Sequence, residues 1–249
     1  MFVSASTTCL PDLTFEEAIP IFWDLEFTAI EVDLHEHGGH MRPSQIHQEF
    51  DRCVTRIMQG HRLDFSAFSV EIDPQDPTPY ETFRSICRFA KATKVVTLVI
   101  PSAELGTPFN EEVEHLQRMV DVASKDGVRL GLKCQIGRMS EDPDTLMVLC
   151  NNVDGLGITL DPSVFVCGPH RNKNLDKILK HVYHVHLRDS KKDKFQVPVG
   201  QGEIEYGRLI NQLERVKYDR ALSIEISPVE DVDQRVELRK LRRLLESLL

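Results

Sequence analysis

The sequence lacks the features that mark membrane and secreted proteins. It contains no run of 18 apolar residues, so we expect no membrane-spanning helix and no membrane partner. Residues 1–5 carry no basic group ahead of an apolar stretch, so we expect no secretory signal. The six cysteines are scattered and form no C-x-x-C pair. In a chain of 249 residues this favours free thiols in a reducing compartment, and we expect a cytoplasmic protein.

A basic balance is also missing. The formal net charge is −9, from 30 Lys and Arg against 39 Asp and Glu, whereas a general nucleic-acid binder normally shows a basic face. We therefore expect no nucleic-acid partner. No G-x-G-x-x-G follows the first apolar run, which weakens a dinucleotide-binding open sheet as an alternative fold. Hydrophobic residues make up 41% of the chain and charged residues 28%, which is typical of a folded domain with a sizeable core.

The chain repeats one pattern eight times, a short β-like run followed by an amphipathic helical stretch. We expect strands at residues 2–6, 29–34, 63–72, 94–100, 128–134, 156–161, 182–189 and 221–227. We expect helices beginning near 14 and 143, at 45–60, 80–92, 110–125, 174–181 and 206–216, and from 232 to the end. No break in composition divides the chain, so the sequence predicts a single α/β domain over 1–249, a closed (β/α)₈ TIM barrel. A homo-oligomer of such barrels is possible.

The expected strand at 182–189 has one apolar and one polar face. Its side chains alternate between an apolar set, Tyr183, Val185 and Leu187, and a polar set, His184, His186 and Arg188. The same alternation in three neighbouring strands places Lys133, Asp161 and Glu225 on the inward face with His186. The strand at 29–34 adds Glu31 and Asp33. By the same alternation Cys134 points outward, so we do not assign it as a nucleophile.

The inward residues are expected to converge at the C-terminal mouth of the barrel, where active sites of this fold lie. Each one taken alone could be a paired polar residue that caps a strand. Together they are harder to explain in that way, because a buried charge is costly unless it is paired or bound to a ligand. Asp161, His186 and Glu225 supply two carboxylates and an imidazole, which suit Mn, Mg, Co or Zn. Such an ion could polarise a sugar carbonyl while a carboxylate moves the proton on the adjacent carbon.

Four segments carry a resemblance to a known family: LDPS at 160–163, HVHLRD at 184–189, VGQGEI at 199–204 and LSIE at 222–225. Together they resemble the xylose-isomerase-like barrel superfamily, which includes sugar and sugar phosphate isomerases and epimerases, and endonuclease-IV-type repair enzymes. The resemblance implies a small sugar or sugar phosphate ligand and one divalent metal held by Glu, Asp, His and Glu from strands five to eight. Carried over, the last three of these ligands match Asp161, His186 and Glu225.

The first ligand of the family does not match, because this chain has Lys133 where the resemblance implies Glu. A second departure is Val164, at a position where the family often has His. Protonated lysine has no lone pair for a metal. Lys133 could be a buried ion-pair partner in an inactive site, or could replace the ion electrostatically. It could instead swing away from a three-ligand metal site or act as a base, or form an imine with a carbonyl. A metal is therefore possible but not required.

We hypothesise a sugar isomerase or epimerase that acts by metal-assisted proton transfer next to a carbonyl. In this hypothesis Glu225 and Lys133 are catalytic, and Asp161, His186 and Glu225 bind the metal. The expected substrate contacts are Glu31, His184, Arg188 and Glu203. The alternative is a barrel without catalysis that serves as a small-molecule binding or regulatory protein. A DNA-repair nuclease, suggested by the run at 189–191, is disfavoured by the acidic balance and by too few histidines for a multi-metal site.

Overall fold

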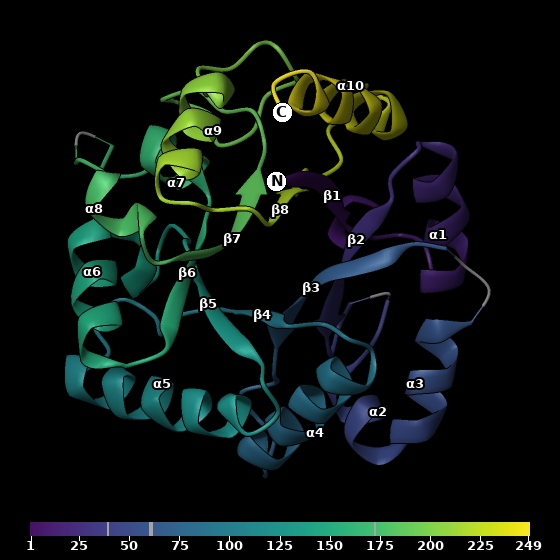
Figure 1. Cartoon of the computed structure of the whole chain (residues 1–249), viewed down its shortest axis with the longest axis vertical. Helices are drawn as coiled ribbons and strands as arrows, with labels where there is room; N and C mark the ends of the chain where they lie inside the picture. The colour runs from purple at the N-terminus through teal and green to yellow at the C-terminus, as the bar shows by residue number, and fades with distance from the viewer. Residues whose placement is uncertain (39, 60–61, 172) are drawn as a thin grey trace.

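The computed structural model describes residues 1–38, 40–59, 62–171 and 173–249, which form a closed barrel of parallel strands inside a ring of helices (Figure 1). The strands are β1 Phe2–Ser6, β2 Ala29–His35, β3 Asp64–Glu71, β4 Thr97–Ile100, β5 Arg129–Lys133, β6 Leu156–Leu160, β7 Val182–Leu187 and β8 Ala221–Ile224. Each strand pairs in parallel with the next, and β8 pairs with β1 to close the barrel. The predicted (β/α)₈ barrel is thus confirmed.

The helices occupy the connections between the strands. They are α1 Phe15–Asp24, α2 Pro43–Gln48, α3 Phe50–Met58, α4 Pro79–Ala92, α5 Phe109–Ser124, α6 Pro143–Asn152, α7 Pro162–Cys167, α8 Asp176–Leu179, α9 Tyr206–Arg215 and α10 Gln234–Glu246. Two short 3₁₀ turns, Thr7–Cys9 and Met139–Glu141, complete them. Capping residues in the sequence determine where several helices begin. Thr14 and Glu17 form a reciprocal capping box at α1, and Asp233 caps α10 by accepting hydrogen bonds from two backbone N–H groups.

Some predicted helices differ from those in the structure. The helix expected at 45–60 is two helices, because the backbone leaves the helical region at Glu49 (φ −126°, ψ 45°); the predicted end at Gly60 lies outside the described residues. The helix expected at 174–181 is only the four-residue α8. The sequence prediction missed α7. It begins directly after β6 because the Asp161 carboxylate caps it and Pro162 starts its first turn.

Three strands end one residue before a charged side chain of the predicted site. Asp161 follows β6, Arg188 follows β7 and Glu225 follows β8, and Lys133 is the last residue of β5. Since the strands are parallel and adjacent, these four residues lie together at the C-terminal mouth of the barrel.

The hydrophobic core lies between the strands and the surrounding helices. The outward sets of β5, β6 and β8 belong to it, as predicted, and Cys134 is buried in it as well. Val185 and Leu187 follow the predicted pattern, but Tyr183 does not. The pairing of β7 with β6 is irregular at this point, and the Tyr183 ring lies against Gly157 on the inner face, between Arg129 and Arg220. The ring therefore helps to fill the lower end of the barrel.

Candidate functional site

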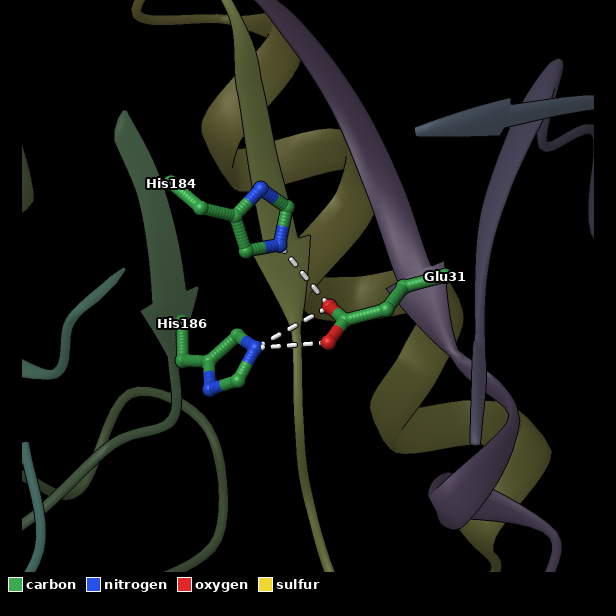
Figure 2. A group of neighbouring side chains, drawn as sticks. All are labelled: Glu31, His184 and His186. Atoms are coloured by element: carbon green, nitrogen blue, oxygen red, sulfur yellow. Dashed lines mark hydrogen bonds and ion pairs between the residues drawn. The ribbon is translucent and has the colours of Figure 1, made fainter. Parts of the chain in front are cut away.

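The inner level of the site is built around the Glu31 carboxylate, which reaches across from β2 to β7 (Figure 2). The Nε2 atom of His184 lies 2.9 Å from Oε2 of Glu31, and Nε2 of His186 lies 2.9 and 3.0 Å from its two oxygens. Ser223 Oγ donates to Oε2 at 2.6 Å. All four residues are at most 1% exposed. We call Glu31, His184 and His186 the inner cluster.

The inner cluster is held together by charge. Burial alone would raise the pKa of Glu31, but the imidazoles of His186 and His184 outweigh it and hold that pKa well below its usual range. Burial would lower the pKa of His186, but Glu225 and Glu31 outweigh it and raise this pKa to about 9. His186 is therefore an imidazolium at neutral pH, and it connects the inner cluster to Glu225. Its Nδ1 lies 3.0 Å from Glu225 Oε2 but is not aligned for a hydrogen bond.

The outer level holds two carboxylates and two cations at the barrel mouth. Lys133 Nζ donates to Glu225 Oε1 at 2.6 Å, and Arg188 Nη2 donates to Glu225 Oε2 at 2.5 Å. Arg188 also contacts Asp161 Oδ2 through Nε at 3.2 Å and Nη2 at 3.1 Å. The other oxygen of Asp161 accepts the backbone N–H of Ser163 at 2.9 Å. We call Lys133, Asp161, Arg188 and Glu225 the mouth cluster.

Mutual contacts fix the ionisation of Glu225 and Lys133 in the mouth cluster. Burial would raise the pKa of Glu225, but His186, Lys133 and Arg188 outweigh it and lower this pKa well below its usual range. Burial would lower the pKa of Lys133, but Glu225 outweighs it and raises that pKa. Lys133 thus stays protonated. Its side chain is 23% exposed, against 10% for Glu225, so the ammonium is the more accessible of the two groups.

A loop after β7 fixes Arg188 from above. Phe195 in this loop packs against the face of the guanidinium, with 4.7 Å between the Arg188 Cζ atom and the ring centroid. The buried Asp189 carboxylate holds the loop by accepting backbone N–H groups of Gly200 and Gly202 at 2.8 and 2.9 Å. A side chain at Gly202 would collide with that carboxylate, so glycine is needed there for the close approach. Arg188 is therefore preorganised rather than free to reorient.

Asp33 adds a further carboxylate on β2. Burial raises its pKa to about 6, although His35 and Lys133 act in the opposite direction. The alternation along β2 placed Asp33 on the inward face, but sequence reasoning gave it no role. Its raised pKa depends on burial among groups from other strands, which no local motif reveals.

The predicted site residues fall into three groups. Lys133, Asp161, Arg188, Glu225 and His186 come together as expected from their alternation. Glu31 and His184 also join them, but their hydrogen bonds with each other and their burial leave them closed to a substrate at the mouth. Glu203 does not join either cluster. Its side chain is 45% exposed and lies 3.8 Å from Lys192.

The predicted metal ligands fit an ion poorly in this arrangement. All four oxygens of Asp161 and Glu225 already contact Lys133, Arg188, His186 or the Ser163 backbone. Protonated Lys133, which donates to Glu225 Oε1, offers no lone pair. Among the described residues, Glu31, His184 and His186 instead place possible ligand atoms within 4.8 Å of one another, and such a set could hold a divalent ion once the imidazole nitrogens lose their protons.

A comparison with known families identifies the family of this barrel. Residues 24–247 match the family described as xylose isomerase-like TIM barrel. The chain belongs to this family. A curated relative of this xylose isomerase-like barrel is an uncharacterized protein of Methanocaldococcus jannaschii, 26% identical over 140 residues. That match spans 50% of this chain and 46% of the relative. The predicted superfamily resemblance is confirmed.

Solved structures share the fold at low sequence identity. A D-tagatose 3-epimerase-like protein matches with a TM-score of 0.75 and 16% identity, covering 100% of this chain and 98% of that one. The IolI protein with a bound zinc atom gives the same four values. A 3-keto-D-glucoside 4-epimerase from E. coli gives a TM-score of 0.75 and 13% identity over 99% of both chains. At these identities the likeness establishes the barrel fold alone.

Across the described ranges, no helix is long and apolar enough to cross a membrane.

Proposed function

We propose that this barrel isomerises or epimerises a small sugar or sugar phosphate by moving a proton on the carbon next to a carbonyl. The observation that carries the proposal is the 2.6 Å contact between Lys133 and Glu225 at the barrel mouth. This reaction needs a group that stabilises negative charge on the carbonyl oxygen, beside a carboxylate that takes up the carbon-bound proton. A 3-keto-D-glucoside 4-epimerase and a D-tagatose 3-epimerase-like protein among the structural neighbours support the same class of chemistry.

Lys133 is the group we assign to the carbonyl oxygen. It is protonated and partly exposed, so its ammonium can turn from Glu225 Oε1 to a substrate oxygen. That movement removes one of the cations that lower the pKa of Glu225, and the carboxylate becomes a better base when the substrate arrives. In this mechanism Lys133 stabilises the enediolate oxygen while Glu225 takes the proton from the carbon next to the carbonyl. In an isomerisation Glu225 returns this proton to the neighbouring carbon. In an epimerisation Glu225 releases it to solvent, and a solvent proton returns to the opposite face of the same carbon.

The other residues have supporting roles in this proposal. Arg188 holds Asp161 and Glu225 in place, rather than binding substrate as its position in the sequence first indicated. Glu31 acts through His186, whose position it fixes, and has no direct contact with substrate. Since the mouth carboxylates fit an ion poorly, no step of the proposed reaction depends on a metal.

Deuterium exchange tests the proposal without knowledge of the product. We would incubate the protein with a panel of aldoses, ketoses and their phosphates in D₂O and follow the C–H signal next to the carbonyl by proton NMR. We expect exchange with at least one compound, and its loss in Glu225→Gln. Glu205→Gln is the matched control, because Glu205 forms only an exposed pair with Arg208. Sugar binding without exchange at any carbon would contradict the proposal and favour a non-catalytic binding protein.

A further inference from the structure

We infer that Lys133 and Arg188 together take the place of a divalent ion between Asp161 and Glu225, so that the mouth of this barrel works without a metal. This inference goes beyond the proposed reaction, because it concerns what the carboxylates bind and holds whether or not a proton is transferred.

The first support is that each oxygen of the Asp161 and Glu225 carboxylates already contacts a charged side chain or a backbone N–H group. Glu225 has Lys133 on one oxygen and Arg188 and His186 on the other. Asp161 has Arg188 on one oxygen and the Ser163 backbone N–H on the other. A metal that entered between them would have to displace charged hydrogen-bond donors from both residues.

The second support is charge balance. Asp161 and Glu225 carry two negative charges, and Lys133 and Arg188 carry two positive charges, as a divalent ion would. Adding an ion to this set would leave uncompensated positive charge where little water can reach, since Arg188, Asp161 and Glu225 are at most 7% exposed.

The third support is that one of the cations is fixed by the fold. Arg188 cannot lose its proton near neutral pH, so it cannot become a neutral neighbour of an ion. Phe195 covers its face, and the loop that carries Phe195 is tied to Asp189 and to the segment that follows β8, where Gln196 exchanges two hydrogen bonds with the Ser227 backbone. Lys133, by contrast, is partly exposed and is the only mouth cation in the described residues placed to meet a ligand oxygen.

The chemistry of the ligand follows from this arrangement. A site with an ammonium donor and no open metal position selects a compound that offers a single hydrogen-bond acceptor to Lys133, such as a carbonyl oxygen. It does not require two neighbouring oxygens that chelate an ion.

Metal content by plasma mass spectrometry tests the inference directly. The protein is purified without chelator or affinity metal, dialysed against Mn²⁺ or Zn²⁺ and freed of excess ion. Wild-type protein should carry no ion that depends on Asp161. Lys133→Glu together with Arg188→Met should gain one equivalent per chain, and adding Asp161→Asn should remove it. Circular dichroism establishes that each variant is folded. If the first double variant is not folded, Lys133→Met together with Arg188→Met removes both charges without adding a new one and should gain the same ion.

Two variants decide where any ion in the wild-type protein lies. An ion that is lost in Asp161→Asn but kept in Glu31→Gln occupies the mouth and overturns the inference. An ion that is lost in Glu31→Gln but kept in Asp161→Asn occupies the inner cluster and supports it. Folded charge variants that gain no ion also contradict the inference, because Lys133 and Arg188 would then not be what excludes it.

Discussion

Glu31→Gln is the substitution whose consequences the structure defines most fully. The change keeps the shape of the side chain but removes the charge that pairs with His186 and draws hydrogen bonds from His184 and Ser223. The new amide also turns one acceptor into a donor that faces imidazole N–H groups. Removing one partner of a buried ion pair typically costs about 3–5 kcal/mol, and we expect a loss of this size in the free energy of unfolding.

The pH dependence gives the sharper test. The pKa of His186 is raised to about 9 from an ordinary value of 6.5. The stability that His186 contributes is therefore fully present below pH 6.5 and is lost as the pH rises through 9, and it amounts to about 3 kcal/mol for such a shift. Glu225 supplies part of this stabilisation and remains in the variant. The difference between wild type and Glu31→Gln should thus be largest near pH 6 and shrink toward pH 9.5.

Urea unfolding followed by circular dichroism at several pH values measures both effects. Glu205→Gln is the control, and its exposed pair with Arg208 should contribute less than about 1 kcal/mol at any pH. A Glu31→Gln variant within about 1 kcal/mol of wild type at pH 6, with no pH dependence in the difference, would refute the charged inner cluster.

Three further predictions concern single residues. Burial raises the pKa of Asp33 to about 6, so the stability linked to its neutral form is lost as the pH rises through 6. In urea unfolding, Asp33→Asn should be up to about 3 kcal/mol more stable than wild type at pH 8 and equal to it at pH 4. Gly202→Ala should displace the loop that holds Arg188 and lower the melting temperature, whereas Gly207→Ala, where the new methyl meets only Leu248 at 3.8 Å, should not; equal melting temperatures would contradict the role of Asp189. Burial raises the pKa of Cys134, while Cys167 is half-buried, so iodoacetamide at pH 8 should label Cys167 first; early labelling of Cys134 by mass spectrometry would contradict its place in the core.

The inward set of side chains could be predicted because strand geometry alone decides it. A period of two residues assigns faces on β5, β6 and β8 wherever bulky and small residues alternate, and it brought Lys133, Asp161 and Glu225 to one mouth. The same rule failed at Tyr183, where the irregular pairing of β6 and β7 reverses the side-chain direction. Such irregularities depend on the neighbouring strand and leave no mark in local sequence.

The pairing of the charges could be predicted only in part. The contact of Lys133 with Glu225 agrees with its interpretation as an ion-pair partner. The bridge from Arg188 to both Asp161 and Glu225 was not foreseen, because a long side chain can reach either a substrate or a neighbouring carboxylate from the same position. Phe195 packs on the guanidinium and holds Arg188 toward the neighbouring carboxylates. Its position depends on a loop folded around Asp189.

Deuterium exchange in the presence of a chelator tests the central claim most directly, since it asks at once whether a proton moves and whether an ion is needed. The account predicts that exchange next to a sugar carbonyl continues in EDTA and disappears in Lys133→Met. Exchange that EDTA abolishes and Mn²⁺ restores would contradict it.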